Sequence, residues 1–89
     1  MRAVITVIGK DMVGILAKVS AICAEHEINV LEVTQSILQD MFAMIMMVDI
    51  EKSDVPFERF ADELNTLGGS MGLSIHTMHE DIFNSMHRI

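Results

Sequence analysis

Residues 9–17, with the sequence GKDMVGILA, hold two glycines around a short polar segment between an apolar run and a helical pattern. A loop that leads from a strand into a helix exposes unpaired backbone N–H groups and the positive end of the helix dipole. Such a loop attracts a carboxylate, and glycine lets a ligand approach the backbone closely. We therefore take this segment as a candidate anion-binding loop. Its residues are Gly9, Lys10, Asp11, Met12, Val13 and Gly14.

The same segment also has a purely structural interpretation. Asp11 stands where its side chain would cap the following helix, and Gly9 and Gly14 would then serve only the geometry of a turn. A carboxylate that caps the helix would occupy part of the space that an anionic ligand needs. Short glycine patterns are weak motifs, so both interpretations are kept at this point.

Four histidines raise the question of a metal site. His76 and His79 are three residues apart on an expected strand, so their side chains would point to opposite faces of a sheet. His26 stands at a helix end and His87 in the C-terminal tail. This distribution is typical of dispersed surface histidines rather than of the convergent ligands that zinc requires. We expect no metal and no cofactor.

Other chemistry is equally sparse. Cys23 falls on the apolar side of an expected helix, where an inert buried thiol is the usual finding. No nucleophile–base or acid–base pair is evident, so we expect no enzyme. A formal charge of −7 with 6 Lys and Arg residues disfavours a nucleic-acid partner, and no apolar stretch is long enough for a membrane span. One cysteine and no signal-peptide pattern make the cytoplasm the simplest compartment.

The elements that would position the loop follow from the periodicity of apolar residues. Residues 3–8 are apolar on both alternations, which is typical of a central strand. The helix that follows has an apolar stripe of Leu16, Val19, Ile22 and Cys23. Residues 28–38 alternate and predict a half-buried strand. Its apolar side holds Leu31, Val33 and Ile37. Gln39 and Asp40 predict a tight turn into a second doubly apolar strand, residues 41–50.

The second half of the chain repeats this order. Ser53 or Asp54 would cap a second helix that has Pro56 in its first turn. Gly68 and Gly69 would end this helix. Its inner stripe would be Phe57, Phe60, Leu64 and Leu67. A last strand is expected at about residues 73–79, followed by a short helix capped by Asp81. The apolar side of that short helix would hold Ile82, Phe83, Met86 and Ile89.

Together these elements predict an α+β fold, a ferredoxin-like βαββαβ sandwich. Its four-stranded antiparallel sheet would carry two helices on one face, with the first and third strands in the middle. We expect one domain, residues 1–89, with a core of 1–80 and a helical tail of 81–89. Because 51% of the residues are hydrophobic and the mean hydropathy is +0.40, we expect a homodimer or larger assembly. A second subunit, the tail or both would cover the open face of the sheet.

The segment ILAKVSAICAEHEINVLEV, together with the loop before it, resembles the ACT domain, a small regulatory module that senses amino acids. The residues that match the family's pattern are Gly14, Ile15, Leu16, Ala17 and Asn29. The segments ITVIGKDMVGI, EINVLEVTQSIL, FAMIMMVDI and IFNSMHRI resemble stand-alone ACT proteins of similar length. They resemble the glycine cleavage system repressor, which carries two ACT units, more distantly.

The resemblance implies that two subunits pair side by side across an edge strand. An amino acid would then bind at the seam, held by the loop and helix start of one subunit and the second strand of the other. Asn29 and Val30 thus join the loop as implied ligand contacts, although Asn29 also suits a turn between helix and strand. The expected function is a non-catalytic regulatory protein with a small-molecule ligand. The alternative is a ligand-free interaction module that regulates a partner enzyme or transcription factor.

Overall fold

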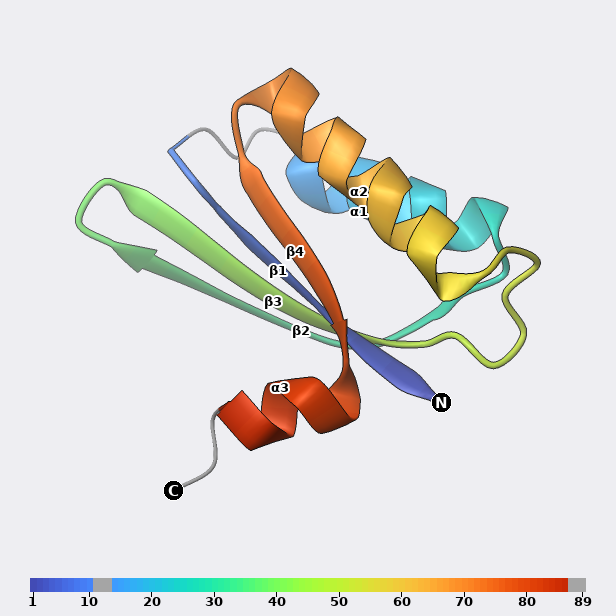
Figure 1. Cartoon of the computed structure of the whole chain (residues 1–89). Coiled ribbons are helices and arrows are strands. Elements are labelled where there is room, and N and C mark those ends of the chain that lie inside the picture. Colours follow the sequence, from blue (N-terminus) through green and yellow to red (C-terminus); the bar gives the residue numbers. More distant parts are fainter. Residues whose placement is uncertain (11–13, 87–89) are drawn as a thin grey trace.

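The computed structural model describes residues 1–10 and 14–86, with Leu38 described by its backbone alone. Strands and helices follow one another along the chain in the predicted order (Figure 1). They are β1 (Arg2–Gly9), α1 (Ile15–Glu25), β2 (Asn29–Leu38), β3 (Met41–Asp49), α2 (Phe57–Met71), β4 (Ser74–His79) and α3 (Glu80–Met86). The predicted βαββαβ sandwich is therefore confirmed.

The four strands form one antiparallel sheet in the order β2-β3-β1-β4. The first and third strands lie in the middle, as their doubly apolar sequences predict. On β1, Thr6 pairs with Ile45 of β3 on one side and with His76 of β4 on the other. Gln39 and Asp40 form the predicted tight turn, because Leu38 pairs directly with Met41.

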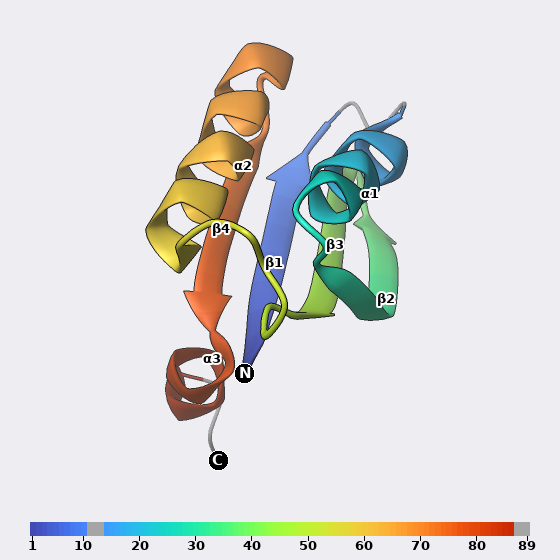
Figure 2. The ribbon, with the colours of Figure 1, turned by 90° about the vertical axis from the view of Figure 1, so that its right-hand side faces the viewer.

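The core lies between the sheet and the two long helices, which both cover the same face (Figure 2). Phe60 and Leu64 of α2 are fully buried, as the predicted stripe requires. On α1 the predicted stripe differs at its first member, because Ile15 is 2% exposed whereas the predicted Leu16 is 38% exposed. The predicted members Val19 and Cys23 are buried. The helix thus begins with its first residue already facing the sheet.

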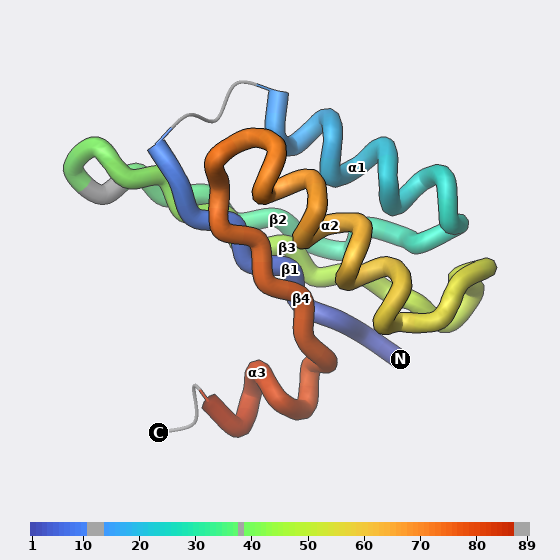
Figure 3. The backbone as a smooth tube through the Cα atoms, turned by 45° about the horizontal axis from the view of Figure 1, so that its top comes forward, coloured from blue at the N-terminus to red at the C-terminus, as the bar shows by residue number. Residues whose placement is uncertain are grey.

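The opposite face of the sheet is covered only in part. The short helix α3 lies on this side, away from α1 and α2 (Figure 3). None of its described residues is buried, and it is joined to β1 by an ion pair between Glu80 and Arg2. Further along the same face, Ile8 and Ile45 are 44% and 41% exposed. A large part of this face is therefore left uncovered by the described residues.

The prediction that β2 is half-buried is wrong for the single chain. Every residue from 31 to 37 is exposed, apolar residues included. A bulge between Val30 and Glu32 shifts the register, and among the described side chains of this strand only Val30 packs against the core. The hairpin of β2 and β3 then extends beyond the two helices (Figure 1). Alternation correctly assigned two faces to this strand, but no described helix covers residues 31–37 of its apolar face.

The limits of α2 also differ from the prediction. Pro56 is the N-cap residue and has no capping side chain, because Ser53 bonds to Val55 and Asp54 bonds to His26 instead. The helix does not end at the two glycines but continues to Met71. Gly72, with φ 70°, provides the left-handed C-cap.

Candidate functional site

The loop residues Gly9 and Lys10 lie at one end of the sheet, on the rim of a pocket of about 550 Å³. The pocket is formed by the ends of β1 and α2 and the starts of β3 and β4. It is lined by Ile8, Gly9, Lys10, Met41, Met71, Gly72, Leu73 and Ser74. Gly9 lies close to Leu73, because a Cβ atom on it would overlap Cδ2 at the end of that side chain, and Leu73 would have to turn aside. Nζ of Lys10 lies 3.9 Å from Oδ2 of Asp40, and both side chains are largely exposed.

Gly14 is the N-cap residue of α1 and adopts a left-handed conformation with φ 77°. Its carbonyl oxygen accepts a hydrogen bond from Lys18 N at 3.0 Å. As a glycine it has no side chain with which to cap the helix, and a Cβ atom there would meet no atom within 4 Å. The backbone N–H groups of the first turn are therefore not covered by the N-cap residue. Asp11, Met12 and Val13 lie outside the described residues, and so does any cap that Asp11 provides.

Asn29 and Val30 begin β2 at the opposite end of the sheet from the loop. Asn29 pairs with Asp49 of β3, whereas Gly9 pairs with Phe42 of the same strand. These two positions on β3 are about seven residues apart, which corresponds to roughly 24 Å at about 3.4 Å per residue. Within one chain the structure does not bring Asn29 and Val30 together with Gly9 and Lys10.

His26 is the polar residue that sequence reasoning placed wrongly. It is only 7% exposed and is not one of a set of dispersed surface histidines. Its Nδ1 lies 2.8 Å from Oδ1 of Asp54, and its Nε2 lies 2.9 Å from Oε2 of Glu63. The hydrogen bonds to Glu63 and Asp54 raise the pKa of His26 above its ordinary value of 6.5. Its position at a helix end was visible in the sequence, but nothing there signalled partners 28 and 37 residues away.

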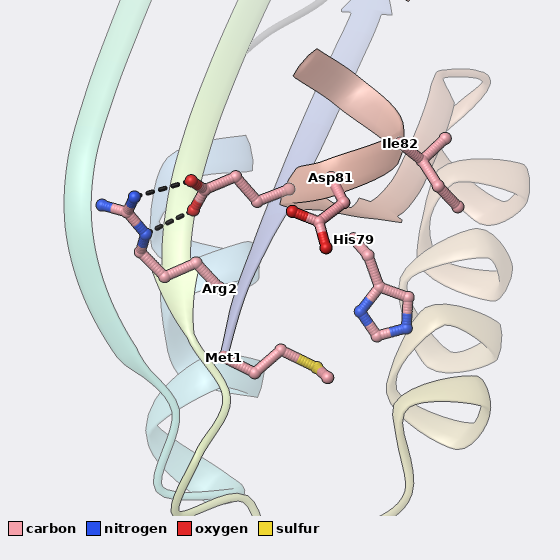
Figure 4. A pocket seen from close by; sticks show the side chains of 6 residues that line it. Met1, Arg2, His79, Asp81 and Ile82 are labelled. Carbon is pink, nitrogen blue, oxygen red and sulfur yellow. Dashed lines mark hydrogen bonds and ion pairs between the residues drawn. The ribbon is translucent and has the colours of Figure 1, made fainter. Parts of the chain in front are cut away.

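A second pocket, of about 560 Å³, lies at the junction of β1, β4 and α3 (Figure 4). Arg2 and Glu80 form an ion pair on one side of it, and His79 lies on the other side (Figure 4). The His79 ring stacks on Phe57 with ring centroids 4.1 Å apart. This stacking places His79 on the helix side of β4, whereas His76 lies on the opposite side with Ile8 and Ile45. The pocket includes none of the predicted ligand residues.

Two further groups bear on chemistry, the metal-ligating side chains and the Cys23 thiol. Among the described residues, no group of three His, Cys, Asp or Glu side chains could hold a metal ion. Burial raises the pKa of the Cys23 thiol from 9.0 to about 11, which leaves it protonated at neutral pH. None of the described helices is both long and apolar enough for a membrane span.

Comparison with known proteins agrees with the fold. Residues 2–78 match the family model for the ACT domain. A UPF0237 protein of Clostridium acetobutylicum is 51% identical over 89 residues and is covered completely, as is this chain. A solved ACT domain protein from Streptococcus pneumoniae superposes with a TM-score of 0.80 and 32% identity over 93% of both chains.

A putative glycine cleavage system transcriptional repressor shares the fold with a TM-score of 0.69 and 23% identity. That match covers 85% of this chain and 43% of the repressor chain. At this identity it shows a similar fold and nothing more. The family assignment rests on the relatives that match over nearly the full length of both chains. This chain belongs to the ACT-domain family and is similar along its whole length to the single-domain UPF0237 proteins.

Proposed function

We propose that this chain is a non-catalytic regulatory module that pairs with a second copy along β2 and binds an amino acid at the seam. The observation that supports this proposal is the state of β2. It is an edge strand of ten residues that, among the described strands, pairs only with β3, and residues 31–37 are all exposed. Its exposed apolar side chains include Leu31 at 45%, Val33 at 37% and Ile37 at 75%. A long apolar edge of this kind is a template for another strand.

The separation of the loop and Asn29 within one chain fits such a pairing. Gly9 pairs with Phe42, which pairs with Ile37, so the loop lies at the C-terminal end of β2. If two β2 strands pair antiparallel about a twofold axis, the N-terminal end of one lies beside the C-terminal end of the other. Asn29 of the partner subunit would then approach the loop and the start of α1.

The chemistry of that place suits a free amino acid. The first turn of α1 presents backbone N–H groups and the positive end of the helix dipole, which together hold a carboxylate. The Asn29 side chain offers both a donor and an acceptor, and it would hydrogen-bond the ligand's polar groups. A ligand held by both subunits stabilises the paired state, because it binds that state and not the separate chains.

The test combines a ligand screen with a variant of the edge. The twenty amino acids are screened at millimolar concentration by thermal shift, and the solution mass is measured with and without each compound that raises the melting temperature. Ile37→Lys places a charge on the exposed edge of β2, whereas Asn65→Lys adds the same charge on the exposed surface of α2. The proposal predicts that Ile37→Lys lowers the mass and abolishes the ligand shift, and that Asn65→Lys changes neither. If no amino acid raises the melting temperature, the sensor function is wrong.

The alternative function, an interaction module that regulates a partner protein without a ligand, is supported by α3. Its Ile82 and Met86 are 52% and 65% exposed, so this helix presents apolar side chains to solvent. Deletion of residues 81–89 separates the alternatives. Loss of partner binding with an unchanged solution mass favours the interaction module, whereas loss of the assembly assigns the tail a structural role.

A further inference from the structure

We propose that His26, in its protonated form, is a positioning residue that fixes the turn from α1 into β2 and so sets the place of Asn29. The role of Asn29 as a ligand contact rests on the proposed function, whereas the effect of His26 on the turn does not. No ligand is needed to observe the effect of His26 on the turn. The inference concerns regulation of the site by the protonation of one buried side chain.

His26 joins three segments that are distant in sequence. It is the C-cap residue of α1, while Asp54 lies in the connection between β3 and α2 and Glu63 lies within α2. The imidazole ring bonds to Asp54 with Nδ1 and to Glu63 with Nε2. Asp54 N also donates to the carbonyl oxygen of His26 at 3.3 Å. The residue is therefore held through both its side chain and its backbone.

The turn that follows is short and leads directly to Asn29. Glu27 adopts a left-handed conformation with φ 58°, which a residue other than glycine adopts only where its surroundings impose it. Ile28 N donates to the carbonyl oxygen of Cys23 at 2.8 Å, and the Ile28 side chain is buried. β2 begins at the next residue. A shift of His26 is thus passed to Asn29 through only two residues.

The geometry requires a proton on each ring nitrogen. A carboxylate only accepts hydrogen bonds, and a neutral imidazole has one N–H group, so both contacts are made at once only by the imidazolium. The charged groups that face the ring are Glu63 from α2 and Asp54 from the β3–α2 connection, and both favour the protonated form. Within the described part of the chain, neither carboxylate forms an ion pair with a lysine or arginine. Deprotonation therefore leaves a nitrogen lone pair against a carboxylate oxygen and breaks one of the two contacts.

The direct test is NMR of the isotope-labelled full chain between pH 5 and pH 9. We expect both ring nitrogens of His26 to carry protons at pH 6.5, its ordinary pKa. Above the midpoint of His26, we expect the residual dipolar coupling of the Asn29 N–H vector to change. The hydrogen-exchange protection factor of the Ile28 amide should fall over the same range. The protection factor of Val7, in the central strand β1, serves as the internal reference.

Conservative variants separate positioning from simple stability. Glu63→Gln and Asp54→Asn keep a hydrogen-bond acceptor but remove a charge, so each should move the His26 midpoint and the Asn29 transition down together. His76→Gln removes an exposed histidine on β4 and should leave both unchanged. If His26 is neutral at pH 6.5, or if the Asn29 and Ile28 signals do not follow its titration, the inference is wrong.

A second arm connects the turn to the ligand. For any amino acid found in the thermal-shift screen, the dissociation constant should rise as pH passes the His26 midpoint. In Glu63→Gln this rise should begin at lower pH, by the same shift as the midpoint. If no amino acid binds at any pH, the proposed function fails, and the NMR arm still decides whether His26 positions the turn. If an amino acid binds with an affinity that does not follow His26, the regulatory part of the inference is wrong while the proposed function stands.

Discussion

Two adjacent glycines of α2 allow the packing of this helix on the sheet to be tested with a matched pair of variants. A Cβ atom on Gly68 would lie 2.9 Å from the carbonyl oxygen of Leu73 and 3.0 Å from Cγ1 of Ile75. A Cβ atom on Gly69 would meet no atom within 4 Å. Gly68 is buried against β4, whereas Gly69 faces solvent. The two glycines thus lie in the same helix but have different surroundings.

Replacement of glycine by alanine in a helix stabilises it by roughly 0.5–1 kcal/mol, so Gly69→Ala should raise the free energy of unfolding by about that amount. Gly68→Ala has the same gain but forces α2 away from a backbone atom that cannot rotate aside. Overpacking of this kind costs about 1–3 kcal/mol. The gain in helix propensity is the same in both variants, so only the overpacking cost separates them. Their free energies of unfolding should therefore differ by about 1–3 kcal/mol.

Denaturant unfolding monitored by circular dichroism measures this difference directly. In a domain of this size about 1 kcal/mol corresponds to roughly 4–8 °C in the melting temperature, so Gly68→Ala should melt several degrees below Gly69→Ala. Equal stabilities would show that α2 does not approach β4 as closely as the structure places it. A more stable Gly68→Ala would refute the packing of this helix altogether.

Three further predictions concern the loop, the thiol and the pH dependence of stability. Gly14→Ala should lower the free energy of unfolding by about 1–2 kcal/mol in denaturant titrations, because alanine is disfavoured at φ 77°; wild-type stability would contradict the left-handed N-cap. Cys23 should resist alkylation by iodoacetamide at pH 8 in the native protein and react once the chain is unfolded, because its pKa is raised to about 11; rapid native labelling would disprove its burial. The pKa of His26 is higher in the folded than in the unfolded chain, so its stabilising contribution is complete below pH 6.5 and is lost as pH rises through the folded pKa. Denaturation midpoints should therefore show wild type losing its advantage over His26→Gln as the pH increases, and a constant advantage would be inconsistent with the ion pairs.

The order of elements was predictable because each strand and helix has its own local period. Residues 3–8 are apolar on both faces, and this local fact alone placed β1 in the centre of the sheet. The cover of β2 was not predictable in this way. Alternation tells which side chains share a face, but whether a helix lies over that face depends on the length and direction of α1. For the same reason the half-buried strand of the prediction is an exposed edge in the single chain.

Errors at the ends of α2 and at His26 share one cause. Asp54 was a good capping residue by local rules, but in the fold it bonds to His26, 28 residues away. Gly68 and Gly69 matched a helix end by local rules, although Gly68 is needed for close contact with Leu73 and Ile75. In each case a long-range contact uses the residue that the local rule had already assigned.

The candidate site was predictable only in its parts. The sequence located Gly9 and Gly14, and the structure supplies a physical reason for each, a close approach at one and a positive φ at the other. The sequence could not show that Asn29 lies at the far end of the sheet from the loop. Pairing of two chains would bring the two parts of the site together. A single sequence does not tell in which register two copies would pair.

The most direct test of this pairing is an intermolecular NOE measurement on a mixture of two differently labelled preparations. Within one chain the helix α1, of 11 residues, separates Gly14 from the start of β2 by about 16 Å at roughly 1.5 Å per residue, which exceeds the range of an NOE. We expect NOEs between the Asn29 side-chain amide of one subunit and Gly14 of the other, strengthened by a bound amino acid. Intersubunit NOEs that involve only the open face around Ile45, or none at any concentration, would contradict it.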